Sequence, residues 1–173
     1  MSTGDKLVTM ARWYPLEPTD ATVFDTAAHI FRYERHFDAD PETVWMSLTS
    51  DRCLADWGSS VQSVTWTTPR PFGIGTCREV VLPAGVARVR EEFFRWDEGS
   101  GYSFFVYESN APLFRRFAED YAVTTDGAGT RFSWTVAIDP KSALRVPFQV
   151  LAPLLRAGFG RMAADGQRYF ADS

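Results

Sequence analysis

The sequence predicts an α+β fold, a curved seven-stranded antiparallel sheet wrapped around one long C-terminal helix. Two patterns predict it. From residue 61 to residue 138, stretches with an apolar–polar period of two are separated by short turns rich in Gly, Pro, Asn and Asp, which is typical of an antiparallel meander. Beyond Pro140 the apolar residues recur with a period of about 3.6, which is typical of a helix.

The first strand and two short helices after it have local signals. Residues 29–37 alternate between apolar and polar side chains, as a half-buried strand does. Asp40 suits the N-cap of a helix and Pro41 suits its first position. A second short helix is expected to begin near Asp51 and to end at Gly58.

The remaining elements follow from the same patterns. Six further strands are expected, at residues 61–67, 76–82, 86–96, 102–108, 117–123 and 130–138. The final helix is expected to begin near Pro153, because proline is tolerated in a first turn and not in a helix interior, and to run to about Asp172. Residues 1–28 are expected to form an irregular arm that allows a homodimer, and residues 29–173 a single ligand-binding domain.

The composition excludes several classes of protein. Aromatic residues make up 15% of the 173 residues, which indicates a large core, an apolar pocket, or both. Basic and acidic residues are intermixed and the net charge is −4, which argues against nucleic-acid binding. No apolar run approaches the roughly 20 residues of a spanning helix, so no stable membrane insertion is expected. The N-terminus has no signal-peptide pattern, and we expect a cytoplasmic protein.

The sequence gives little sign of catalysis by a metal or a nucleophile. Cys53 and Cys77 belong to no Cys-x-x-Cys pair and have no histidine at ligand spacing, which favours two reduced thiols. His29 and His36 share no cluster with a nucleophile, and no Ser-His-Asp set is visible. We therefore expect no metal and no cofactor.

Two carboxylates stand on otherwise apolar strand faces. Glu91 and Glu119 each have the parity of the apolar residues in their strand. A buried carboxylate must be paired, hydrogen-bonded or protonated. These residues either orient a polar group of a ligand, or act as general acid and base, or form structural ion pairs with an arginine such as Arg35 or Arg95. The structural alternative is the more common one.

The expected site is a set of inward-facing side chains. Tyr121 offers a phenol that could stabilise a ligand enolate, although such tyrosines are more often core residues. Glu91, Glu119 and Tyr121 are weak catalytic candidates, and no catalytic residue is assigned. Phe94 and Trp96 break the alternation of their strand, which predicts a bulge near residue 94. The predicted ligand-binding residues are Tyr33, Phe72, Glu91, Phe93, Phe104, Glu119, Tyr121, Phe132, Trp134, Leu155, Phe159 and Met162.

Four short motifs occur in a characteristic order. They are residues 37–45, where the first strand passes into a helix, Trp57, the Gly75-Thr76 loop, and the last hairpin at residues 129–134. In this order they resemble the START/Bet v 1-like (SRPBCC) superfamily, and most of all its bacterial polyketide cyclase/dehydrase and lipid-transport branch, over about residues 29–171. The resemblance implies a helix-grip fold with two short helices after the first strand. It implies no particular reaction, because the superfamily contains carriers, receptors, cyclases and adaptors.

Three functions are consistent with these observations. The favoured hypothesis is a binding or carrier protein that encloses an apolar or aromatic small molecule, such as a lipid or a polyketide-like compound. The alternative is an aromatase/cyclase or dehydratase acting on a polyketide-like substrate, with an inward carboxylate moving the proton. The third is an interaction module of the co-chaperone type, which would have a filled interior.

Overall fold

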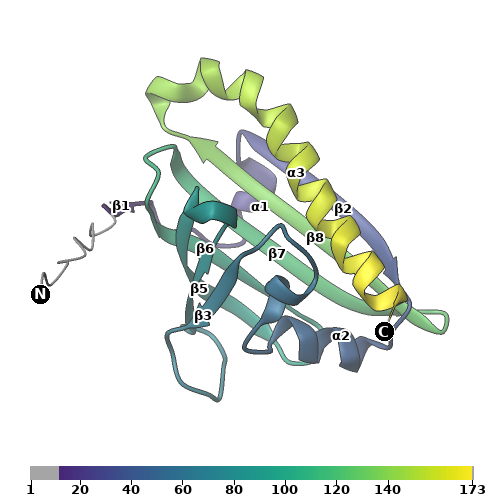
Figure 1. Cartoon of the computed structure of the whole chain (residues 1–173). Helices are drawn as coiled ribbons and strands as arrows, with labels where there is room; N and C mark the ends of the chain where they lie inside the picture. The colour runs from purple at the N-terminus through teal and green to yellow at the C-terminus, as the bar shows by residue number, and fades with distance from the viewer. Residues whose placement is uncertain (1–11, 173) are drawn as a thin grey trace, which may run out of the picture.

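The computed structural model describes residues 12–172 (Figure 1). The first long strand, β2 (His29–Phe37), lies where the alternation predicts it. It leads into α2 (Pro41–Leu48), where the Asp40 carboxylate accepts a hydrogen bond from the Thr43 backbone N–H at 3.0 Å. The second short helix is the 3₁₀ turn η1 (Cys53–Asp56). Both short helices after the first strand are therefore confirmed.

The remaining strands form one antiparallel meander. They are β3 (Ser63–Trp66), β4 (Cys77–Val81), β5 (Arg88–Asp97), β6 (Gly101–Ser109), β7 (Phe114–Asp126) and β8 (Gly129–Pro140). The seven strands lie in the order β2-β8-β7-β6-β5-β4-β3, so that the first strand pairs with the last. The 3₁₀ turn η2 (Pro83–Gly85) connects β4 to β5, and η3 (Ser142–Leu144) follows β8. The predicted seven-stranded sheet with one long C-terminal helix is confirmed.

The long helix begins earlier than the sequence predicted. α3 (Arg145–Ala171) starts about two turns before Pro153, so the predicted start at this proline is wrong. Pro153 lacks the N–H that would bond the Gln149 carbonyl. Gln149 is exposed, so water can bind that carbonyl instead. Phe148 and Ala152 are buried and hold the first turns on the sheet, which outweighs the lost hydrogen bond.

The helix is anchored to the concave face of the sheet at both of its ends. α3 runs diagonally along β2 and β8 (Figure 1). Near the C-terminus of the helix, the Phe37 ring stacks on Phe132 and Phe170, with centroids 4.9 and 5.0 Å apart. Near its N-terminus, Phe148 lies 4.9 Å from the His29 ring. Between these anchors the helix faces the other strands of the curved sheet.

The bulge predicted near residue 94 is confirmed. The register of β5 against β6 shifts between Phe93 and Arg95, which leaves Phe94 as the extra residue. Phe94 packs with an apolar cluster on the convex face, and Trp96 packs against the main core. The bulge therefore explains why Trp96 faces the core. Phe94 keeps the outward parity of its strand and is apolar because it packs against Phe24 and Phe105 on the convex face.

The N-terminal segment covers part of the convex face. Residues 1–11 of the predicted irregular arm lie outside the described residues. The rest contains β1 (Tyr14–Pro15), which pairs with the end of β6, and one turn of helix, α1 (Val23–Thr26). Val23 is fully buried against the convex face, and the Arg90 guanidinium lies 3.9 Å from the centre of the Trp13 ring. Trp13 and Tyr14 therefore contact the sheet of their own chain.

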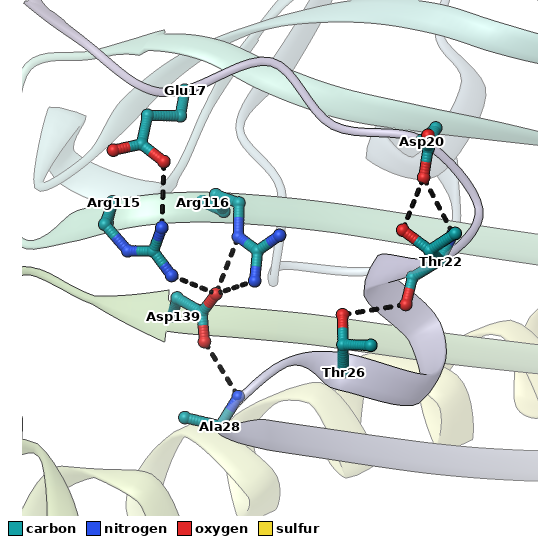
Figure 2. Close-up of polar contacts among 8 residues, drawn as sticks. All are labelled: Glu17, Asp20, Thr22, Thr26, Ala28, Arg115, Arg116 and Asp139. Atoms are coloured by element: carbon teal, nitrogen blue, oxygen red, sulfur yellow. Dashed lines mark hydrogen bonds and ion pairs between the residues drawn. The ribbon is translucent and has the colours of Figure 1, made fainter.

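A buried carboxylate holds this segment in place. Asp139, at the end of β8, accepts a hydrogen bond from the Ala28 backbone N–H at 2.8 Å (Figure 2). It also accepts from Arg115 at 2.9 Å and from Arg116 at 2.7 Å, and Arg115 reaches on to Glu17 in the segment at 2.8 Å. Burial alone would raise the pKa of Asp139, but the Ala28 N–H and Arg116 lower it below its usual value.

Replacement of Asp139 with Asn should destabilise the fold. The change leaves Arg116 without its charged partner and Arg115 with Glu17 alone, and it should cost about 2 kcal/mol of unfolding free energy at neutral pH. Because the folded pKa is lowered, this stability is present above the unfolded pKa and is lost as the pH falls through the folded pKa. Urea unfolding at several pH values measures both effects.

The matched control is Asp126→Asn, which alters a more exposed carboxylate that contacts His36 and Arg131. It should change stability little. Equal effects of the two substitutions would show that Asp139 does not secure the segment.

Candidate functional site

A cavity of about 260 Å³ lies between the concave face of the sheet and α3. For comparison, an apolar cavity of about 150 Å³ is large enough for benzene. Val86, beside η2, lines the cavity although it is 77% exposed, which places an opening there. The lining residues are Leu54, Val61, Arg78, Val80, Leu82, Val86, Ala87, Val89, Glu91, Phe104, Ser109, Ala111, Leu113, Phe114, Phe117, Glu119, Tyr121, Leu155, Phe159 and Met162.

The first polar feature of the cavity is a buried ion pair. Arg78 on β4 and Glu91 on β5 lie directly opposite each other in the sheet, so their side chains meet on the same face. Arg78 Nε donates to Glu91 Oε2 at 2.5 Å, and both side chains are almost fully buried. Arg78 Nη1 donates to the Cys53 sulfur at 3.2 Å. Arg78 Nη2 is buried without a hydrogen-bond partner among residues 12–172.

The environment keeps Arg78 charged. Burial by itself would lower its pKa, but the Glu91 carboxylate beside it raises that pKa well above the usual value. The guanidinium also lies over aromatic rings, with centroids of Phe104 at 4.7 Å and Phe93 at 5.0 Å. A buried charge whose hydrogen bonds are incompletely satisfied is costly, so Nη2 is a ready donor to a polar group in the cavity.

The second polar feature is a carboxyl group hydrogen-bonded to two rings. Glu119 Oε2 accepts from the Tyr121 hydroxyl at 2.8 Å and from Trp134 Nε1 at 3.0 Å. Burial raises the pKa of Glu119 to about 8, and the nearby Glu91 charge adds to the rise, against the two hydrogen bonds that lower it. At neutral pH the group is therefore mostly a neutral acid. Because Oε2 already accepts two hydrogen bonds, the proton belongs on Oε1, which can donate to a ligand.

Strand alternation places these groups. Glu119 and Tyr121 are two residues apart on β7, so both face the concave side. Trp134 on β8 is directly opposite Tyr121, which brings its ring N–H to Glu119. Tyr121 is buried, and its pKa is raised well above the usual value by burial and by Glu119, so it remains a neutral hydrogen-bond donor.

Seven of the twelve predicted ligand-binding residues line the cavity. They are Glu91, Phe104, Glu119, Tyr121, Leu155, Phe159 and Met162. The other five lie outside its lining. Phe93, Phe132 and Trp134 are buried in the surrounding core. Tyr33 donates its hydroxyl proton to the Arg156 carbonyl on α3 at 2.8 Å, and Phe72 stacks on Trp66 with centroids 4.2 Å apart.

Arg78 is not among the residues predicted from the sequence, although a signal for it is present. Arg78 has the same parity as Val80 and Leu82 in its strand, which is the argument that selected Glu91. The arginine that pairs with Glu91 is therefore Arg78 and neither of the two suggested from sequence. Arg95 instead bonds Asp120 at 2.7 Å. The Arg35 guanidinium donates to the Glu34 carbonyl.

The site has no feature of a metal centre. Among residues 12–172, no three His, Cys, Asp or Glu side chains lie together as a metal site needs. Cys53 is buried, which raises the pKa of its thiol and keeps it protonated. The chemistry that these groups offer is hydrogen-bond donation and proton transfer inside an apolar cavity.

Comparison with known proteins identifies the family. Residues 28–168 match the family described as polyketide cyclase / dehydrase and lipid transport. The chain belongs to this family. An uncharacterized protein of Mycobacterium tuberculosis, Rv2574, is 31% identical over 156 residues, which cover 90% of this chain and 93% of the relative. A protein of Mycobacterium bovis, Mb2604, also uncharacterized, matches with the same identity and coverage.

Solved structures of family-like proteins share the fold. The protein TTHA0849 from Thermus thermophilus superposes with a TM-score of 0.67 at 19% identity, over 83% of this chain and 98% of its own. A START superfamily protein from Mycobacterium smegmatis gives 0.63 at 9% identity, over 82% and 94%. The major latex-like protein 151 of Panax ginseng gives 0.58 at 14% identity, over 79% and 97%. The predicted polyketide cyclase/dehydrase and lipid-transport branch is confirmed by the family match, and these structures show the same fold.

No helix within residues 12–172 combines the length and the apolar character that crossing a bilayer requires.

The raised pKa of Glu119 should be visible in the pH dependence of stability. Because the folded pKa of about 8 exceeds the usual 4.5, the neutral form stabilises the fold below the unfolded pKa, and this contribution is lost as the pH rises through the folded value. Urea unfolding from pH 5 to pH 9 should show the wild type losing stability relative to the Glu119→Gln protein.

The control is Glu79→Gln, on the same sheet. Burial alone would raise the pKa of the Glu79 carboxyl, but Arg88 and Arg90 lower it below 4.5. The difference in unfolding free energy between Glu79→Gln and the wild type should stay constant from pH 5 to pH 9. A flat difference for Glu119→Gln as well would refute the neutral-acid assignment.

Proposed function

We propose that the protein binds an apolar or aromatic small molecule, such as a lipid or a polyketide-like compound, inside the cavity beneath α3 and acts as its carrier. The observation that carries this proposal is the cavity itself. Its lining is largely aliphatic and aromatic, with a few buried polar groups at fixed positions, which is the usual composition of a small-molecule site. Burial of apolar ligand surface, at about 25 cal/mol per Å², supplies the affinity.

The polar groups indicate what the ligand carries. Arg78 Nη2 is a buried donor without a partner among the described residues, and neutral Glu119 offers a second donor from Oε1. A carbonyl, carboxylate or hydroxyl oxygen on the ligand would satisfy them. The ligand is therefore an apolar or aromatic body with at least one oxygen acceptor that reaches β4 or β7.

A substitution that fills the cavity tests the carrier proposal. Val89 lines the cavity from β5, so Val89→Trp should occupy the ligand volume and reduce the affinity for an aromatic probe, anilinonaphthalene sulfonate, at least tenfold, a loss of about 1.4 kcal/mol. Fluorescence titration measures the affinity. Circular dichroism confirms that each variant is folded.

Ile74→Trp is the matched control, because Ile74 is 75% exposed and lies outside the cavity lining. It should bind the probe as the wild type does. If Val89→Trp and Ile74→Trp bind equally well, the probe does not enter the cavity and the proposal fails. Native mass spectrometry of the purified protein would then identify any molecule that it retains.

One observation favours a second candidate, an aromatase/cyclase or dehydratase. Glu119 has a pKa of about 8, close to neutral pH, as an efficient general acid or base does. Its hydrogen bonds to Tyr121 and Trp134 fix its orientation, and the nearby Arg78 would stabilise an enolate oxygen.

The Glu119→Gln protein distinguishes an enzyme from a carrier. For an enzyme, turnover of a poly-β-ketone thioester should fall by about 100-fold or more while probe binding persists. Turnover that is unchanged would make Glu119 a binding or structural group. Product analysis by liquid chromatography and mass spectrometry provides the measurement. The third candidate, a co-chaperone-like adaptor, is disfavoured because the interior is not filled.

A further inference from the structure

The first half of α3 is apolar on the face that points away from the sheet. Val146, Val150 and Leu154 succeed one another at intervals of four residues, so they lie along one side of the helix. They are 74%, 77% and 69% exposed, and no other described residue covers them. The exposed Pro153 and Ala157 adjoin this row. We call Val146, Val150 and Leu154 the outer stripe.

A helix that is apolar on both faces is usually buried on both. The inner face of this segment packs on the sheet through Phe148 and closes the cavity through Leu155. The outer stripe has no such partner within the described chain. Scattered exposed apolar residues need no explanation, but a row of three large ones on a single helix face marks an interaction surface.

The charged residues of this helix segment are all positive. The segment from residue 141 to residue 164 contains Lys141, Arg145, Arg156 and Arg161 and no acidic residue, although the whole chain has a net charge of −4. Arg145, Arg156 and Arg161 are exposed. Their guanidinium groups form no ion pair or hydrogen bond with any other described residue. By contrast, most arginines of the sheet form ion pairs, as Arg78, Arg90 and Arg95 do.

We propose that the outer stripe of α3 is a docking surface for an anionic phospholipid membrane. A row of exposed aliphatic side chains, on a helix segment whose exposed charges are unpaired arginines, is the kind of feature with which a helix binds in the plane of a bilayer. The apolar row would enter the acyl boundary while Arg145, Arg156 and Arg161 contact anionic headgroups. This binding is peripheral, and it requires no spanning segment.

The charge pattern favours a membrane over a second copy of this chain. Isologous pairing of two outer stripes would bring the basic residues of both copies together, which is repulsive. An anionic surface instead neutralises all of them. Docking through the outer stripe would also place the membrane next to the helix segment whose inner face lines the cavity. The proposal itself does not depend on a ligand in the cavity.

Vesicle sedimentation tests the proposal with the full-length protein. The wild type should bind vesicles of phosphatidylcholine with one-third phosphatidylglycerol, and should bind pure phosphatidylcholine vesicles much more weakly. Raised salt should weaken the binding severalfold, because screening removes the electrostatic part. The V150E/L154E protein should bind the anionic vesicles at least about tenfold more weakly, because it loses apolar burial and gains two negative charges.

M46E/Q167E is the matched control, because it places two glutamates at exposed positions away from the outer stripe, one of them a large apolar residue. It should retain most of the binding. V150S/L154S, which adds no charge, should also bind weakly. Circular dichroism and thermal unfolding verify the fold of each variant, and all four sites are exposed, so folding should survive.

Three results would overturn the proposal. The first is a wild type that fails to sediment with anionic vesicles, and the second is equal binding of these vesicles by V150E/L154E and M46E/Q167E. Light scattering coupled to size-exclusion chromatography gives the third. A wild-type dimer that V150E/L154E converts to a monomer would show that a second copy covers the outer stripe.

Discussion

One helix is too narrow to cover a seven-stranded sheet, and the rest of the structure follows from that mismatch. Seven strands about 4.8 Å apart make a sheet roughly 29 Å wide, whereas a helix with its side chains is about 10–12 Å across. α3 packs directly on β2 and β8, at one side of the sheet. The sheet must curve to bring β4 to β7 toward the helix, and the bulge at Phe94 assists the bend. Closure remains incomplete, and the remaining space is the cavity.

The polar groups in that cavity contribute little to the stability of the fold. Taking Arg78 and Glu91 out of water costs several kcal/mol per ion, and a buried pair often stabilises no more than apolar residues of similar volume. The pair nevertheless lies on the apolar concave face, and the Glu91 charge influences the ionisation of Glu119 on a strand two places away. Such an arrangement is better explained by recognition or chemistry than by folding.

The features that could be predicted from the sequence are those set by neighbouring residues, such as strand alternation. The start of α3 and the extent of the cavity lining depend on tertiary packing and could not be predicted. Alternation located β2 and the parity of Glu91 and Glu119, because each strand residue has only two faces to choose between. Parity cannot tell which part of the concave face lies beneath α3. Trp134 is on the same face as the lining residues of β7 but is buried in the core outside the cavity lining. The rule for proline was applied to Pro153 as if the helix stood alone. The helix begins about two turns before Pro153 because Phe148 and Ala152 pack on the sheet, and no local sequence pattern reveals this packing.

The N-terminal segment has a consequence for where this fold can be divided. The family match begins at residue 28, so residues 12–27 resemble an appendage when only the match is considered. Those residues nevertheless cover Phe105, Ala118 and Ala137 on the convex face. Arg115, which is bonded to Asp139, also bonds Glu17 and so holds the segment in place. The middle strands are therefore buried on both faces, like the centre of a three-layer protein. A fragment cut at the edge of the match would expose an apolar surface and a free edge on β6, and would tend to aggregate.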